Sequence, residues 1–298
     1  MQSLARGWSF LKQAWSMAFK DRDMLKPSIY ALFIGLIISV IGIIPIIIAA
    51  LVLGDNVIGR VVMGGLGVIL MFAQFVVSYV FSAMTIYLIY GYLTKGDGRM
   101  DEAWAVVRRD FFDILTLAAV STIVGALRSM TSNNRRNNVI GGILRSLMRA
   151  VEALWTEAAF LVLPAMVIDD LNLKDGLARI LKITKENLLL IGISTVGVRA
   201  VTGLIGFVVS FIGIVIAIAI GGGLAYVSNG NTAITIIGIT IGALIFFTFI
   251  MFVSLFSSYT NTAYHTCLYI WAREVETARA QGSAAQVQAP APLALALS

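Results

Sequence analysis

Long apolar runs alternate along this chain with short charged segments. Residues 27–54, 61–94 and 200–272 contain no Asp, Glu, Lys or Arg, and a shorter run of this kind covers 114–127. A helix needs only about 20 apolar residues to cross the hydrocarbon core of a bilayer, and helices that are apolar all round are typical of membrane spans. The pattern therefore predicts an all-α, polytopic helical membrane protein.

Six membrane-spanning helices are predicted, and the middle two differ from the rest. The third and fourth stretches are short and contain acidic residues, so an alternative is four spans plus a re-entrant hairpin formed by residues 111–168. The last two spans exceed about 30 residues, which is longer than the hydrocarbon is thick, so they must tilt, bend or protrude. The predicted spans cover residues 28–53, 61–91, 111–127, 150–168, 188–220 and 233–263.

An amphipathic helix is predicted before the first span, over residues 2–20. Large apolar side chains recur there at spacings of three and four, and basic residues lie off that stripe. Such helices lie in the headgroup plane of a membrane. We expect Trp8 and Trp15 to face the hydrocarbon and Lys12 and Lys20 to face anionic lipid headgroups.

The order of amphipathic segment and apolar hairpin occurs three times. Segments 101–110 and 172–187 each precede a hairpin as residues 2–20 do, which indicates either a parallel repeat or the ordinary alternation of a polytopic protein. The predicted organisation is an interfacial helix and elbow over 1–26, a membrane domain over 27–272 and a disordered cytoplasmic tail over 273–298.

Composition and charge agree with the membrane prediction and add an orientation. The chain is 59% hydrophobic and 13% charged, against about 25% charged in an ordinary soluble domain. With six spans, 15 Lys and Arg residues lie on the side of the termini and 6 on the other side. The predicted location is the cell (inner/plasma) membrane, and the positive-inside rule predicts that both termini lie in the cytoplasm.

The expected partners follow from the same charges. Basic segments beside spans indicate a bilayer with anionic lipids, and a homo-oligomer or another membrane protein is a further expected partner. No basic element stands clear of the membrane, so we expect no nucleic-acid partner.

Catalytic motifs are missing from the sequence. The chain has one histidine, His265, and one cysteine, Cys267, so it holds no intrachain disulfide and no multi-cysteine metal site. It has no phosphate-binding loop, no His-Glu-x-x-His and no Gly-x-Ser-x-Gly. We therefore expect a protein that is not an enzyme and needs no cofactor or metal.

Four ionisable residues lie inside or near apolar stretches: Asp113, Glu152, Glu157 and Arg199. Such residues are costly in lipid and by default mark a polar site or a buried pair. Arg199 has two interpretations. It contacts an anion or forms a salt bridge with Glu157 or Asp113 inside the bundle, or it extends to the headgroups from a protruding helix. The excess length of that helix favours the second.

Glycines are the expected packing residues of the last two spans. Gly238 and Gly242 form a Gly-x-x-x-Gly pattern, and Gly203 and Gly206 lie on the preceding span. Small residues let helices approach closely in lipid. The pattern predicts either a tight hairpin or a contact between copies of the chain.

Two passages resemble a known kind of protein. One runs from Trp8 to Pro27, and the other contains Pro164 and Asp169 followed by an Ala/Lys-rich segment to residue 187. Together they resemble an uncharacterised family of prokaryotic integral membrane proteins, a domain of unknown function. The layout is also similar to that of CysZ-type permeases, with interfacial helices and a half-spanning hairpin. The resemblance implies an interfacial helix before the first span, and it implies no reaction.

The sequence as a whole favours a membrane scaffold or accessory subunit. The alternative is a small-solute or ion permease or channel that uses polar groups of the helix bundle, near Arg199 and the polar end of the sixth span.

Overall fold

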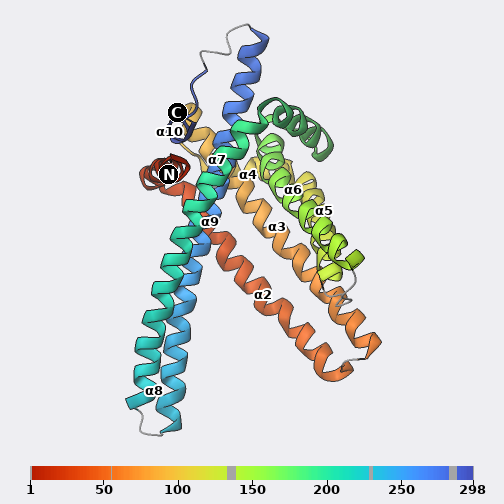
Figure 1. Ribbon diagram of the computed structural model, residues 1–298, viewed down its shortest axis with the longest axis vertical. Coiled ribbons are helices and arrows are strands. Elements are labelled where there is room, and N and C mark those ends of the chain that lie inside the picture. Colours follow the sequence, from red (N-terminus) through yellow and green to blue (C-terminus); the bar gives the residue numbers. More distant parts are fainter. Residues whose placement is uncertain (1, 55, 133–138, 228–230, 282–286, 298) are drawn as a thin grey trace.

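Three antiparallel helical hairpins extend in one direction from a layer of shorter helices (Figure 1). The computed structural model describes residues 2–54, 56–132, 139–227, 231–281 and 287–297. The hairpins are α2–α3, α5–α6 and α7–α9, the last closed by η2 and α8. The elements are α1 (Gln2–Lys20), η1 (Arg22–Leu25), α2 (Lys26–Leu53), α3 (Val57–Lys95), α4 (Met100–Arg109), α5 (Phe111–Ser132), α6 (Val139–Asp169), α7 (Leu173–Ala217), η2 (Ile218–Gly222), α8 (Gly223–Val227), α9 (Thr232–Ala280) and α10 (Ala291–Leu297).

The predicted fold class is confirmed. Among the described residues, six helices are long and apolar enough to cross a membrane. The predicted amphipathic segment at 172–187 and most of the predicted span at 188–220 belong to one continuous helix, α7, and the last residues of that span belong to η2. The first part of α7, dark green in Figure 1, runs across the top of the molecule before the helix turns down beside α9.

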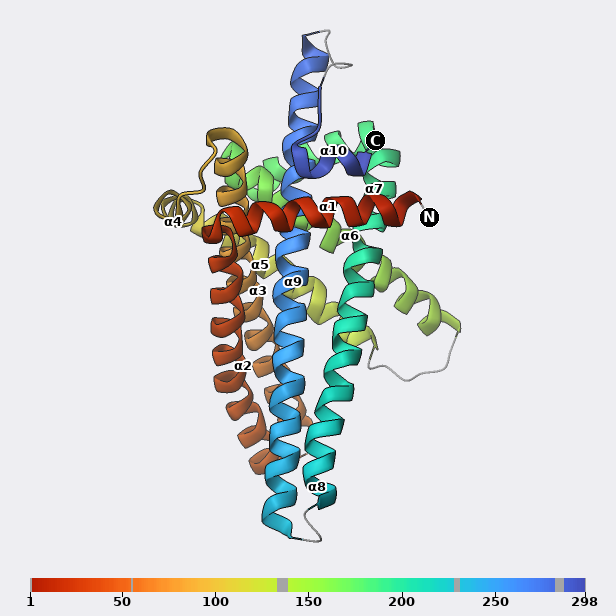
Figure 2. The ribbon, with the colours of Figure 1, turned by 90° about the vertical axis from the view of Figure 1, so that its left-hand side faces the viewer.

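The shorter helices form a layer that we call the collar: α1, α4, α10 and the first part of α7. All lie at one end of the molecule, and both chain termini are there (Figures 1 and 2). Helix α1 runs across α9 rather than along it (Figure 2). The three segments predicted to be amphipathic therefore share one level, which is the arrangement expected of helices at a membrane surface.

Helix α1 is bound to the bundle by one of its faces. The indole Nε1 of Trp15 donates to the hydroxyl of Thr260 over 3.1 Å, and the hydroxyl of Tyr259 donates to the carbonyl of Ala14 over 3.1 Å. The Tyr259 side chain is completely buried. The buried residues of this face are all apolar, and the two alanines among them let the helix approach the bundle closely: Phe10, Leu11, Ala14, Met17 and Ala18.

The middle hairpin is shorter than its neighbours. In both ribbon views the far end of α5–α6 lies well short of the tips of the other two hairpins (Figures 1 and 2). It is fixed to α3 by Ser121, whose hydroxyl bonds to Tyr79 over 2.8 Å and accepts from the indole of Trp155 over 2.9 Å. Both of its helices are nevertheless among the six that are long and apolar enough to cross a membrane.

Close approach of backbones defines the α7–α9 hairpin. A Cβ atom on Gly221 would lie 2.8 Å from the carbonyl oxygen of Gly238, and one on Gly242 would lie 2.9 Å from a carbonyl oxygen of α7. A Cβ on Gly206 would lie 3.2 Å from a side chain of α9, whereas one on Gly203 would meet nothing within 4 Å. Three of the four predicted packing glycines thus lie inside the hairpin, and Gly203 faces open space.

The C-terminal segment differs from the prediction of a disordered tail. Helix α9 continues through Ala280, and α10 forms over Ala291–Leu297. Leu293 of α10 is completely buried in the core together with Phe10 of α1. Composition alone gave no sign of this contact, because an Ala/Pro-rich segment orders only where another surface buries its few large side chains. Residues 282–286 of the predicted tail lie outside the described residues.

Candidate functional site

Three helices bring one acid and two basic side chains together at the level of the collar. Glu157 of α6 forms an ion pair with Arg199 of α7. The other carboxylate oxygen of Glu157 lies 3.5 Å from Nε2 of His265 on α9. The group links the short hairpin to the long α7–α9 hairpin, and we call it the Glu157 cluster.

Local contacts of α9 hold His265 in place. Its Nδ1 lies 2.7 Å from the carbonyl oxygen of Asn261, one turn earlier. Phe160 stacks on the imidazole with the ring centroids 4.9 Å apart, and Tyr264 meets it edge-on at 5.2 Å. The His265 side chain is 2% exposed. Its orientation toward Glu157 is therefore set by the contact with Asn261 and by the two neighbouring rings.

The Glu157 cluster lies far from the tip of the α7–α9 hairpin. Arg199 precedes Val227 by 28 residues and His265 follows Thr232 by 33 residues, which correspond to about 42 Å and about 50 Å of helix. A hydrocarbon core of about 30 Å that begins at the tip ends before it reaches these residues, and a tilt of about 20° changes this little. With the hydrocarbon placed in this way, the cluster lies outside it, where an ion pair is less costly than in hydrocarbon.

The other two predicted polar residues lie elsewhere. Glu152 forms an ion pair with Arg128 of α5. Asp113 lines a separate cavity of about 460 Å³ together with Trp155 and residues that begin α7. The structure thus brings Arg199 and Glu157 together, as one of the two interpretations of Arg199 predicts, and does not bring Asp113 or Glu152 to them.

A second charged group, which the sequence did not predict, surrounds Asp169 at the end of α6. The Asp169 carboxylate accepts a hydrogen bond from the hydroxyl of Tyr269. It also lies 3.1 Å from Nε of Arg273 and 3.3 Å from Nε of Arg179. Its side chain is 12% exposed. Because these partners come from α7 and α9, Asp169 joins the ends of three helices within the collar.

Glu276 extends this group along α9. Its carboxylate lies 3.3 Å from the guanidinium of Arg179 and 2.8 Å from the ammonium of Lys182. The basic face of the amphipathic part of α7 is therefore turned partly toward α9. One feature of the sequence could have predicted the charged group around Asp169. An acid ends an apolar stretch there, and basic residues occur in two other segments that are predicted to lie on the same side of the membrane.

Two further acids fasten the connections of the collar. The carboxylate of Asp21 accepts from the backbone N–H of Gly98 over 3.0 Å, which holds the α1–α2 elbow against the turn between α3 and α4. Asp110 lies 2.6 Å from Nε of Arg109, which also lies 3.1 Å from Asp170. Burial raises the pKa of Asp110 above its ordinary value, and the bond from Arg109 opposes this shift.

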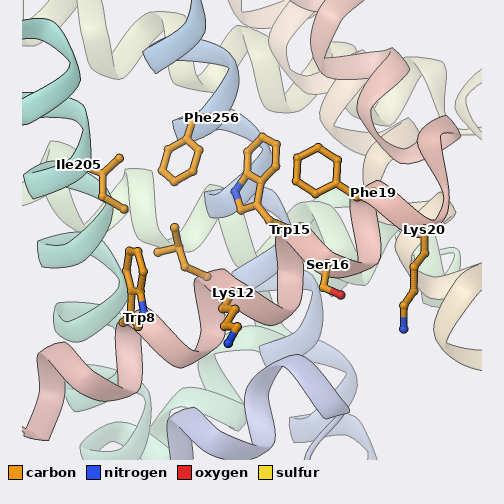
Figure 3. Close-up of a pocket in the computed structure, with 9 residues that line it drawn as sticks. Trp8, Lys12, Trp15, Ser16, Phe19, Lys20, Ile205 and Phe256 are labelled. Atoms are coloured by element: carbon orange, nitrogen blue, oxygen red, sulfur yellow. The ribbon is translucent and has the colours of Figure 1, made fainter. Parts of the chain in front are cut away.

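The predicted anchor residues of α1 divide into two groups. Trp8 is 57% exposed, and Lys12 and Lys20 are exposed as well. Trp15 instead lies against the bundle, where its ring stacks on Phe256 with the centroids 5.0 Å apart. Figure 3 shows the two lysines extending to one side of α1 and the Trp15 ring lying on the other.

No protein-family model matches the chain, and no curated protein sequence matches it. The predicted resemblance to an uncharacterised family and to CysZ-type permeases therefore remains a prediction. Among the described residues, no three His, Cys, Asp or Glu side chains are grouped so that they could hold a metal ion. The fold and the spans define the class: this is a multi-pass helical membrane protein.

Proposed function

We propose that the protein is a membrane scaffold or accessory subunit of the cell (inner/plasma) membrane, with its collar and both termini in the cytoplasm. One observation carries the proposal: the Glu157 cluster joins three helices of the same chain, through an ion pair between Glu157 and Arg199 and a contact between Glu157 and His265, outside the hydrocarbon. The apolar parts of the long hairpins, residues 27–54, 61–94 and 200–272, contain no Lys, Arg, Asp or Glu. A charged group that could bind a solute inside the hydrocarbon is not found in those segments.

The two long hairpins supply the surface that a scaffold needs. They diverge as they leave the collar (Figure 1). On α2, the face turned away from α3 carries a stripe of isoleucines at helical spacing, each more than half exposed: Ile37, Ile41, Ile44 and Ile48. On α7 a comparable stripe is at least half exposed: Leu204, Phe207, Phe211 and Val215. Large apolar faces of this kind suit contact with lipid tails or with another membrane protein.

Photo-crosslinking in native membranes tests the proposal. A benzoylphenylalanine probe placed at Ile41 on α2 and at Phe207 on α7 should give a discrete protein product on irradiation, because both side chains face away from the chain's own core. The product would be measured by its mass on a denaturing gel and by mass spectrometry.

Purified protein in lipid vesicles is the control for this experiment. A product of twice the chain's mass that persists there indicates self-association, and a product seen only in native membranes indicates another subunit. Adducts with lipid alone at both positions would contradict the proposal.

A permease or channel for small anions is the second candidate. It is favoured by Arg199, whose side chain is 45% exposed although it is paired with Glu157. The polar end of α9 argues against it, because two of its hydroxyl groups already have partners within the protein. Thr260 accepts a hydrogen bond from Trp15, and Thr266 donates one to the carbonyl of Thr262. The permease candidate predicts an anion flux that Arg199→Ala removes.

A further inference from the structure

Helix α1, α7 and α9 enclose a groove of about 720 Å³ on the side of α1 that faces the hairpins. This is within the range of about 300–1,000 Å³ that is typical of small-molecule sites. Its walls are apolar and mostly aromatic: Trp8, Leu11, Trp15, Phe19, Ile205 and Phe256. Trp8 and Phe19 are 57% and 68% exposed, so the groove is open to its surroundings.

The groove lies one hydrocarbon thickness from the hairpin tip. Phe256 follows Thr232 by 24 residues and Ile205 precedes Val227 by 22 residues, which correspond to about 36 Å and about 33 Å of helix. With a hydrocarbon core of about 30 Å, both residues fall at the boundary between acyl chains and headgroups. The groove therefore faces lipid acyl chains on one side and lipid headgroups on the other.

One rim of the groove is basic and polar. Lys12, Ser16 and Lys20 recur every four residues, so they share one face of α1. Figure 3 shows them extending away from the rings of Phe19 and Phe256. Within the described residues, neither lysine forms a salt bridge with an acidic side chain. Their charge is thus available to a ligand.

We propose that this groove binds one anionic phospholipid of the collar-side leaflet. An acyl chain lies along the aromatic wall formed by Trp15 and Phe256, and the phosphate of the headgroup meets the ammonium groups of Lys12 and Lys20 and the hydroxyl of Ser16. Apolar walls below a basic rim, at the depth where a phospholipid changes from acyl chain to phosphate, match this ligand and no soluble anion. The bound lipid would fill the space between α1 and the α7–α9 hairpin.

Lipid binding to the full-length protein in neutral detergent tests the proposal. Native mass spectrometry should detect one retained phosphatidylglycerol per chain, bound at least about tenfold more tightly than phosphatidylcholine. Lys12→Gln/Lys20→Gln should weaken phosphatidylglycerol binding by about tenfold or more, since each lysine near an anionic headgroup is worth about fivefold. Arg6→Gln/Lys174→Gln removes two positive charges outside the groove and should bind phosphatidylglycerol as wild type does.

A variant without any change of charge separates the groove from general electrostatics. Ile205→Trp fills the apolar wall and should also weaken phosphatidylglycerol binding, while the protein keeps its elution volume in size-exclusion chromatography. The proposal is overturned if the Lys12/Lys20 variant binds as the charge-matched control does. It is overturned equally if phosphatidylcholine binds as tightly, or if glycerol phosphate in water competes as well as the lipid, since that result would indicate a site for a soluble anion.

Discussion

Replacing Asp169 with asparagine should destabilise the protein by about 2–3 kcal/mol and lower its thermal midpoint in detergent by about 5–10 °C. The substitution keeps the shape of the side chain but removes the charge that neutralises Arg179 and Arg273. The hydroxyl of Tyr269 also loses a charged acceptor, and hydrogen bonds to charged groups are the stronger ones. Unfolding followed by tryptophan fluorescence would measure the effect.

The neighbouring residue is a matched control for this prediction. Asp170→Asn makes the same chemical change one position later, at a side chain that is 65% exposed and, among the described residues, pairs only with Arg109. Its backbone has a φ of 55°, a conformation that asparagine tolerates well. An exposed pair is worth less than about 1 kcal/mol, so the midpoint should move by no more than about 2 °C. Equal losses at the two positions would contradict the role assigned to Asp169.

Removing the acid of the Glu157 cluster should have the next largest effect. Glu157→Gln leaves Arg199 and the buried His265 without their carboxylate. We expect a loss of about 1 kcal/mol, because the Glu157 and Arg199 side chains are 32% and 45% exposed. Arg199→Gln should lower the stability less in the Glu157→Gln variant than in the wild type, because the partner of Arg199 is already absent there. The resulting coupling energy should be about 0.5–1 kcal/mol, measured by unfolding all four proteins in lipid nanodiscs.

A pair at the water-exposed surface of the collar provides the comparison. Lys95 and Glu102 lie 3.1 Å apart and are 60% and 31% exposed. The same cycle of glutamine substitutions there should give no measurable coupling, and 1 M salt should not change that result. If the Glu157–Arg199 coupling is also absent, the cluster does not hold the helices together.

The spans could be predicted from the sequence because a bilayer leaves little choice of structure. An apolar run of more than about 20 residues must satisfy its own backbone hydrogen bonds, and a helix does this. The charged linkers between runs then located the ends of α2, α3 and α5 to within about five residues. Helix α6 begins 11 residues before the predicted span and α9 continues 17 residues beyond it, because both helices extend through segments that carry charged residues. The fusion of the amphipathic segment at 172–187 with the following span was not predictable, since the change in polarity there is as sharp as at a helix boundary.

Helix α1 shows why the candidate sites were harder to predict. The stripe of Trp8, Trp15 and Phe19 indicated one apolar face turned toward lipid. The helix has a second contact face, made of small and flexible residues such as Ala14 and Met17, which packs on α9. A periodic pattern gives one preferred direction, so it does not separate a face that meets protein from a face that meets lipid.

Pairing between distant residues was predictable only in part. A salt bridge between Arg199 and Glu157 or Asp113 was one of two interpretations, because isolated charges in apolar helices are costly, but the length of the helix favoured extension of Arg199 to the headgroups. The contribution of His265 was missed, because its side chain reaches Glu157 only when α6 packs against α9. Asp169 was missed for a different reason. An acid at the end of an apolar run is expected to face water, and only the assembled collar buries it.

An ion-flux measurement with purified protein tests the central claim, a scaffold without transport, most directly. Wild-type protein and Arg199→Ala would be reconstituted at equal density into liposomes, and uptake of sulfate, phosphate and chloride would be followed against protein-free liposomes, with a known anion channel as the positive control. The scaffold proposal predicts that wild type, Arg199→Ala and protein-free liposomes have the same permeability to all three anions. A flux of any of them that requires the wild-type protein and disappears with Arg199→Ala would contradict it.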